Sequence, residues 1–253
     1  SVRPFELPGQ YDRKRMRSMG RVAMLATRSS ELAMEDAGLL GDPVLTSGKT
    51  GVAYGSSSGS PIALSQLASM MLTKNTDSVK ANSYIQMMSH TTAVNVSVFF
   101  GICGRLIPTS SACTSGSLAI GEAYEAIRYG KQTVMIAGGA EEISPSQAAV
   151  FDTLFATSTR NDTPTETPSP FDADRDGMVI GEGAATVVLE EMEHAQARGA
   201  HIHAEVIGFG TNSDGQHVTQ PSARTMAVAM QLALDDAELA PEAIGYVNAH
   251  GTA

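Results

Sequence analysis

The stretch RLIPTSSACTSGSLAIGEAYEAIRYGKQTVMIAGGAEE, residues 105–142, decides the fold of this chain. It predicts an apolar strand at 105–112, a helix at 115–130 and a strongly apolar strand at 133–142. The predicted helix has Ile120, Ala123, Tyr124 and Ile127 on one face. A helix that joins two buried strands is the crossover unit of a parallel sheet.

Other segments extend this alternation. Further strands are predicted at 50–55 (TGVAYG), at the start of 183–199 before a short helix, at 201–210 and at 244–251. Further helices are predicted at 13–38, 62–73, 90–100 and 224–237. The alternation predicts an α/β protein with a buried, mostly parallel sheet. A polar stretch at 152–177 is too long for an ordinary connection and is predicted to be a functional or interface loop.

The composition excludes several classes of protein. Among 253 residues, 42% are hydrophobic and 17% charged, which suits one large domain or two small ones with a packed core. The formal net charge of −10 disfavours nucleic acid as a partner, because phosphate backbones attract basic surfaces. No apolar run is long enough to span a bilayer. Two cysteines make no disulfide framework, so we expect a reducing, cytoplasmic location.

Two motifs for metal or phosphate fail on spacing. The run DADRDG (172–177) imitates a calcium loop, but the twelfth position, which needs a bidentate glutamate, is Gly183. The run SGKT (47–50) imitates a phosphate loop, but Pro43 stands where its first glycine should be. No cysteine and histidine spacing suits zinc, so we expect no metal site.

A serine hydrolase is one alternative. The run GSSSG (55–59) follows a predicted strand and matches the nucleophile elbow G-x-S-x-G, with Ser57 as the nucleophile. Asp214 and His250 follow in the chain order of that enzyme class. Short runs of glycine and serine are also common in turns.

Cys113 is the stronger candidate nucleophile. It stands between an apolar strand and a helix, where free N–H groups and the helix dipole favour the thiolate over the thiol. Small neighbours leave room for a substrate carbonyl, and the Cys113 N–H could help to hold an oxyanion. The competing interpretation is an inert, buried cysteine, which is the role expected for Cys103. His250 is predicted to end a strand beside Gly251, in a position to face a cleft and support the thiolate.

These segments carry a resemblance in their order along the chain. The relevant runs are GVAYGSSSG (51–59), SSACTSGSLAIGEAYEAIRYG (110–130), MIAGGAEE (135–142), STRNDTP (158–164), FDADRDGMVIGEGA (171–184), VVLEEMEHAQARGAHIHAEVIGFG (187–210) and YVNAHGT (246–252). Together they resemble the β-ketoacyl-acyl-carrier-protein synthases, the condensing enzymes of fatty-acid synthesis. The resemblance implies the thiolase-like fold, a layered α/β sandwich.

The resemblance also implies a reaction and roles for residues. An acyl group passes from the phosphopantetheine arm of a carrier protein to Cys113, and malonyl-carrier protein then loses carbon dioxide and attacks the acyl thioester. His250 matches the first of two family histidines that support decarboxylation, and Thr252 matches a threonine that contacts the pantetheine arm. The enzyme needs no cofactor of its own, since its substrates carry phosphopantetheine.

Further residues carry over from the family more weakly. Arg13, Lys14 and Arg17 resemble a docking patch for the acidic acyl carrier protein, with a solvated helix start as the other interpretation. Ser58 and Phe151 match positions in the acyl pocket, although a plain core role suits Phe151 equally. Further matches are a buried structural carboxylate, Glu182, and two residues that reach across the family's homodimer interface, Tyr84 and Ile85.

The family pattern is present only in part. Its opening strand, its second histidine and its lysine are not matched, and most of the C-terminal half is missing. We therefore expect an N-terminal half at 1–199, the start of a C-terminal half at 200–253, and a piece that is inactive by itself. Another alternative is a non-catalytic synthase-like partner subunit, which the retained Cys113 disfavours. Acyl-chain length and the choice between fatty-acid and polyketide pathways stay open.

Overall fold

A strand, a helix and a second strand form within 105–142, as predicted. The computed structural model describes residues 5–9, 11–217 and 220–251. The three elements are β2 (Leu106–Pro108), α5 (Ser115–Arg128) and β3 (Val134–Glu141). The first strand is shorter than predicted, because the backbone leaves the sheet after Pro108 and turns toward the start of α5.

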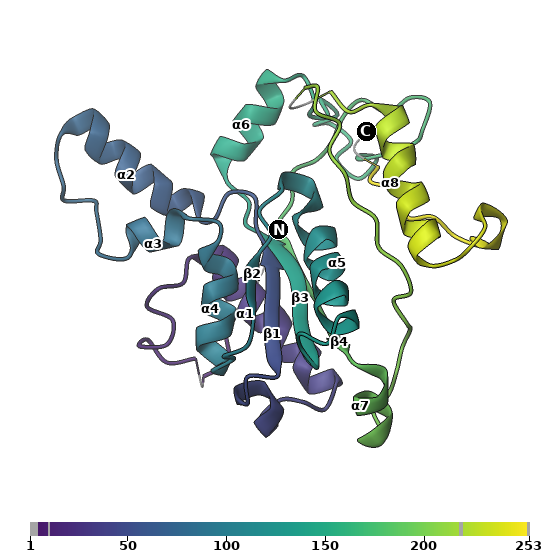
Figure 1. The fold of residues 1–253 in the computed structure, drawn as a ribbon. Helices are drawn as coiled ribbons and strands as arrows, with labels where there is room; N and C mark the ends of the chain where they lie inside the picture. The colour runs from purple at the N-terminus through teal and green to yellow at the C-terminus, as the bar shows by residue number, and fades with distance from the viewer. Residues whose placement is uncertain (1–4, 10, 218–219, 252–253) are drawn as a thin grey trace.

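Four strands form one sheet in the order β2-β1-β3-β4. Here β1 (Thr50–Gly55) runs parallel to both β2 and β3, whereas β4 (Gly183–Glu190) runs antiparallel to β3. Figure 1 shows these strands at the centre of the molecule. The predicted α/β class with mostly parallel strands is confirmed.

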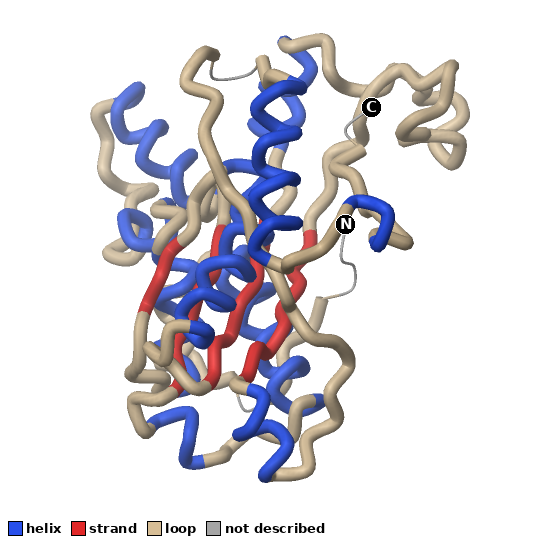
Figure 2. Tube along the Cα trace, turned by 45° about the vertical axis from the view of Figure 1, so that its right-hand side comes forward, coloured by secondary structure: helices blue, strands red, loops and turns tan. Residues whose placement is uncertain are grey.

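Helices cover both faces of the sheet (Figure 2). On one face lie α1 (Arg21–Asp36) and α4 (Thr91–Phe100), and on the other lies α5. Successive side chains of a strand point to opposite faces. Val52, Tyr54, Val134 and Ile136 accordingly pack toward α1 and α4, whereas Met135 packs toward α5. The α5 side is built largely from alanines, which lets the helix approach the sheet closely.

The first helix begins later than predicted. Residues 13–18 form turns, and α1 begins at Arg21 after Gly20. A Cβ at Gly20 would lie 2.5 Å from the Cβ of Ser60, so a tertiary contact fixes this boundary. Beyond β1, α2 (Pro61–Thr73) and α3 (Ser83–Met87) form a lobe at the left of Figure 1.

The segments predicted as strands at 201–210 and 244–251 do not form strands, so both predictions are wrong. A strand needs a neighbour for its backbone hydrogen bonds, and no described residue supplies one. The first segment packs instead between α5 and α8 (Ala223–Asp236): the ring of Phe209 lies against Gly121, and Gly208 against Ala233. This places α5 in a middle layer, between the sheet and α8 (Figure 1).

The remaining elements are short. The helix α6 (Pro145–Thr153), which like α3 was not predicted, follows β3, and α7 (Met192–Ala197) follows β4. Short 3-10 turns lie at Pro43–Thr46, Ala112–Thr114 and Pro241–Ala243. The long polar stretch between α6 and β4 is irregular, with one bridge between Thr157 and Met178. Within the described ranges, no helix combines the length and apolar character needed to cross a membrane.

A partly buried cluster of charged residues holds α7 against the sheet. The carboxylate of Glu190 accepts bonds from Arg198 Nε at 2.7 Å and Nη2 at 2.6 Å, and lies 2.5 Å from His194 Nδ1. Burial acts to raise the pKa of Glu190, but the bonds from Arg198 and His194 outweigh it and hold the pKa below its ordinary value. Because its pKa is lowered, the ionised Glu190 stabilises the fold at pH values above the ordinary glutamate pKa. This contribution is lost as the pH falls through the lowered pKa.

Replacing Arg198 with methionine is therefore expected to lower the free energy of unfolding at neutral pH by about 2 kcal/mol. The difference from the wild type should shrink as pH falls below the ordinary glutamate value of 4.5. Urea unfolding at neutral and acidic pH measures both effects. Arg224→Met, at an exposed position on α8, is the matched control and should leave stability unchanged. If Arg198→Met lowered the free energy of unfolding by the same amount at every pH, this account would be contradicted.

Candidate active site

Cys113 lies on the 3-10 turn Ala112–Thr114, directly before α5, and its side chain is exposed. The sheet determines where this predicted site residue lies. The parallel strands β1 and β3 end beside the start of α5, and the carboxyl ends of parallel strands are where α/β proteins bind ligands. The first peptide N–H groups of a helix have no partner within that helix, so this position favours a negatively charged group.

Two glycines bring the helix start onto the strand ends. A Cβ on Gly55, the last residue of β1, would lie 2.5 Å from the Cβ of Ser115. A Cβ on Gly139 of β3 would lie 3.1 Å from the Cα of Gly116. Gly55 has no room for a side chain, and Gly139 could accept one only if the start of α5 shifted. The close approach fixes the height of Cys113 above the sheet edge.

The turn that carries Cys113 is braced by Ser115. The Ser115 hydroxyl donates to the carbonyl of Ala112 at 2.6 Å and accepts from the N–H of Ser111 at 2.9 Å. Thr109 donates from its hydroxyl to the Ser115 carbonyl at 2.9 Å. Ala112 has a φ of +51°, a left-handed conformation that costs a non-glycine residue roughly 1–2 kcal/mol. These bonds hold the backbone in this strained shape, which turns the Cys113 side chain outward.

Cys113 opens into a large cavity of about 1150 Å³. The cavity lies between the turn after β1, the start of α5, the ends of β3 and β4, and α6. Its lining is mostly small or apolar, and includes Leu64, Ile120, Val150, Phe151 and Val187. An exposed thiol beside an apolar cavity of this size can accept and hold the acyl chain of a thioester.

One wall of the cavity is a hydrogen-bonded network that the sequence reasoning missed. Glu141, at the end of β3, accepts from the N–H of Ser57 at 2.7 Å. The side-chain amide of Gln147, on α6, donates to Glu141 at 3.4 Å and to Ser58 at 3.3 Å. The run SPSQ (144–147) is the sequence pattern that could have predicted α6, because it is a capping box with proline at the first helical position.

The predicted site residues are only partly brought together. Ser58 and Phe151 line the same cavity as Cys113. His250 does not line it: its side chain is exposed, and the strand expected to end there is absent. Beside it, Gly251 lies against Pro170 and Phe171 of the long loop. Thr252 lies outside the described residues.

The alternative nucleophile Ser57 also lines the cavity, on an exposed part of the turn after β1. Within the described part of the chain, no hydrogen bond links its hydroxyl to Asp214 or His250. The second cysteine differs from its expectation as a buried residue. Cys103 is exposed, and its thiol lies 3.0 Å from the Thr46 carbonyl, outside the cavity lining.

The residues that match the family more weakly lie in three places. Arg13, Lys14 and Arg17 are exposed in the turns before α1, and Tyr84 and Ile85 are exposed on α3. The predicted buried carboxylate is confirmed. The side chain of Glu182 is 1% exposed and accepts two bonds of 2.8 Å from Arg21, and these bonds raise the pKa of that guanidinium.

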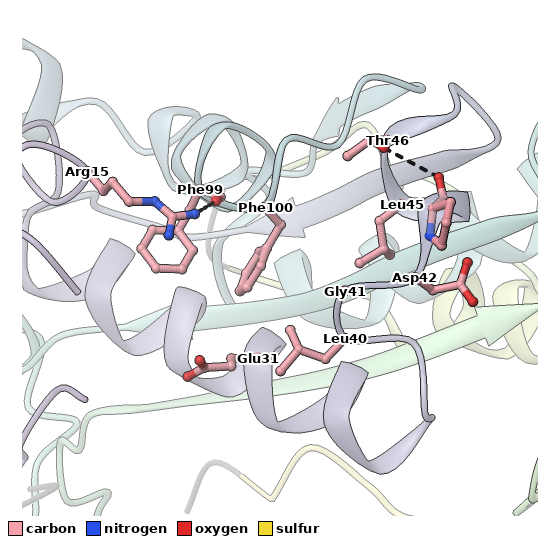
Figure 3. A pocket seen from close by; sticks show the side chains of 10 residues that line it. Arg15, Glu31, Leu40, Gly41, Asp42, Leu45, Thr46, Phe99 and Phe100 are labelled. Atoms are coloured by element: carbon pink, nitrogen blue, oxygen red, sulfur yellow. Dashed lines mark hydrogen bonds between the residues drawn. The ribbon is translucent and has the colours of Figure 1, made fainter. Parts of the chain in front are cut away.

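A second cavity of about 360 Å³ lies between α1, the end of α4 and the turn Pro43–Thr46 (Figure 3). Its charged groups already have partners. The Arg15 guanidinium lies 4.0 Å from the centre of the Phe99 ring and donates to the Phe99 carbonyl. Glu31 accepts from the Tyr11 hydroxyl at 2.8 Å. Cys113 does not line this cavity, which makes it a poor candidate for the reaction centre.

Comparisons with known proteins show to which family the chain belongs. Residues 4–195 match the family model "Beta-ketoacyl synthase, N-terminal domain", and residues 203–253 match "Beta-ketoacyl synthase, C-terminal domain". The chain is 40% identical to 3-oxoacyl-[acyl-carrier-protein] synthase 2 of Vibrio cholerae over 254 residues, which are 99% of this chain and 61% of the relative. The chain thus spans about three fifths of the length of that relative.

Solved structures give the same result. A β-ketoacyl synthase from Burkholderia phymatum is 63% identical, with a TM-score of 0.96 over 99% of this chain and 61% of that one. A type II polyketide ketosynthase, solved in complex with its acyl-carrier protein, is 32% identical, with a TM-score of 0.82 over 92% of this chain and 59% of that one. The layered fold is therefore thiolase-like, as expected, and the chain belongs to the β-ketoacyl synthase family.

Proposed function

We propose that the protein is a β-ketoacyl-acyl-carrier-protein synthase, an acyltransferase that extends acyl chains by decarboxylative condensation. The observation that carries the proposal is the position of Cys113, exposed at the start of α5 and beside a large apolar cavity. The family membership supports the same reaction. The resemblance to fatty-acid enzymes favours fatty-acid elongation, and no resident cofactor or metal is part of the proposal.

The chemistry balances around one sulfur atom. The Cys113 thiolate attacks the thioester of an acyl carrier, the acyl–sulfur bond of the carrier breaks, and the carrier thiol takes up the proton. Malonyl-carrier protein then loses carbon dioxide, and its carbanion attacks the acyl carbonyl on Cys113. The carbon–sulfur bond of Cys113 breaks, and the thiolate is regenerated. The positive end of the α5 helix dipole suits the charge that develops on oxygen.

Labelling separates this proposal from a serine hydrolase. A thiol-directed acyl mimic is expected to modify Cys113, and a fluorophosphonate is expected to leave Ser57 unmodified. Peptide mapping by mass spectrometry locates each adduct. A Cys103→Ser variant is the background, because Cys103 is also exposed but lies outside the cavity lining. A fluorophosphonate adduct on Ser57, with Cys113 unreactive, would overturn the proposal in favour of the hydrolase.

His250 is proposed to support decarboxylation and condensation by donating a hydrogen bond to the thioester oxygen of the malonyl group. The resemblance supports this role, with Thr252 as the contact for the pantetheine arm. His250→Ala is expected to slow carbon dioxide release and condensation by about 10²-fold or more, with a smaller effect on acyl loading of Cys113. Separate assays of loading and of carbon dioxide release test the assignment. Loss of loading alone would contradict it.

The proposed partner is an acyl carrier protein, which is the partner named for the related polyketide ketosynthase. Arg13, Lys14 and Arg17 form an exposed basic group on a chain with a net charge of −10, and such a group suits an acidic carrier. We further propose a homodimer, with the exposed Tyr84 and Ile85 at its interface, and a cytoplasmic location.

A further inference from the structure

Glu142, the residue directly after β3, is fully buried where the starts of α1 and α2 meet. Its Oε2 atom accepts a hydrogen bond of 2.9 Å from the N–H of Val22 in α1. The N–H of Ile62 in α2 bonds to the same carboxyl group. Val22 and Ile62 are each the second residue of their helix, where an N–H has no partner within the helix. One side chain therefore caps two helices.

The residues that precede these two helices do not cap them in the described structure. Gly20 has no side chain to offer α1, and the Ser60 side chain makes no cap bond to α2. The Ser60 hydroxyl instead donates to Glu142 Oε1 at 3.1 Å. Burial raises the pKa of Glu142 above its ordinary value, and the three donors and the charge of Arg21 act against this rise. Glu142 thus takes the place of both caps and joins the two helix starts.

The turn between β1 and α2 is held at both ends by neighbouring glutamates. Glu141 accepts from the N–H of Ser57 at 2.7 Å, and Glu142 accepts from Ser60 at the other end. The turn and the first residues of α2, residues 57–64, form what we name the α2 wall of the cavity that receives Cys113. Its lining residues are Ser57, Ser58, Pro61 and Leu64. Glu142 does not line this cavity, so it can act on an acyl chain only through the α2 wall.

We propose that Glu142 is a positioning residue of the acyl site, which holds the α2 wall in the place where long acyl chains pack against it. An acetyl group fills little of a cavity of about 1150 Å³ and needs only the surroundings of Cys113. A longer chain gains binding free energy from the apolar area that it buries, and Leu64 supplies part of that area. A displaced α2 wall therefore weakens the loading of long chains more than that of acetyl. This inference rests on the proposed acyl transfer to Cys113.

The test compares the N-acetylcysteamine thioesters of acetate and octanoate as donors to the full-length protein, and intact mass spectrometry follows loading of Cys113. Glu142→Met removes both acceptor oxygens and is expected to slow octanoyl loading about tenfold relative to acetyl loading. Glu142→Gln keeps the shape and one acceptor oxygen, so the relative loss should be only about threefold. Ser60→Ala removes one donor and should shift the ratio in the same direction. Added to Glu142→Met, it should cause no further loss, because both changes act on one contact.

Glu31→Gln is the matched control, because it changes another buried glutamate, which lies on α1 outside the lining of this cavity and accepts from the Tyr11 hydroxyl at 2.8 Å. It should lower stability and keep the wild-type ratio of octanoyl to acetyl loading. Urea unfolding identifies the folded variants, and Glu142→Gln decides the test if Glu142→Met does not fold. A wild-type ratio in the folded Glu142 variants, or an equal loss for both donors, would overturn the inference alone. Absence of loading with both donors in the wild type would overturn the proposed acyl transfer as well.

Discussion

In the full-length protein, replacing Cys113 with alanine is expected to abolish acyl loading and condensation, with a fall to background of at least about 10³-fold. The covalent intermediate forms on this sulfur, and alanine offers no atom that could take its place. The substitution should leave the fold intact, because the side chain is exposed on a turn that is braced by Ser115 and Thr109. Intact mass after incubation with acyl-carrier protein measures loading, and release of the free carrier measures turnover.

Cys103 supplies the matched control for this experiment. It is the other free thiol, it is also exposed, and it lies outside the cavity lining. Cys103→Ala should load Cys113 at the wild-type rate. Full condensation by Cys113→Ala would refute the proposed mechanism.

Replacing Gly138 with alanine is expected to lower the free energy of unfolding by about 3 kcal/mol. The new Cβ would lie 2.2 Å from the carbonyl oxygen of Ala185 and 2.8 Å from the ring of Tyr54. Neither neighbour can move easily, because Ala185 belongs to the adjacent strand β4 and Tyr54 is almost fully buried. Burial also raises the pKa of Tyr54 to about 12, and its hydroxyl lies 2.9 Å from that of Thr186.

Gly183→Ala is the control for Gly138→Ala, because it makes the same change in the same sheet. Gly183 pairs with Glu141 across the β3–β4 ladder, and a Cβ there would meet no atom within 4 Å. Its stability should stay within about 0.5 kcal/mol of the wild type. Chemical denaturation of both variants gives the comparison. Equal stability of the two variants would show that the close contact at Gly138 carries no cost.

The elements with the strongest local signals could be predicted from the sequence. The strands β1 and β3 are buried, and a buried parallel strand appears as a continuous apolar run that differs clearly from its surroundings. The helix α5 shows helical periodicity, and its position directly after Cys113 follows from that pattern. The fold class and the position of Cys113 at the start of a helix were predictable for this reason, since both depend on one strand–helix–strand unit.

The features that could not be predicted from the sequence depend on partners that are distant along the chain. Segments 201–210 and 244–251 alternate like strands, but no neighbouring strand pairs with them among the described residues. The start of α1 depends on the contact between Gly20 and Ser60. At the site, the family resemblance implied Ser58 in the pocket but not Gln147, because a hydrogen bond across 89 residues leaves no local pattern in the sequence.

The segments at 201–210 and 244–251 have a practical consequence for handling the protein. They expose β-branched and aromatic side chains, including Val206, Ile207, Tyr246 and Val247, along backbone that no strand covers in the described structure. Such backbone is a template for pairing between molecules. Preparations of this chain should therefore be kept dilute and followed by light scattering, since turbidity would rise with concentration even while every molecule remains natively folded.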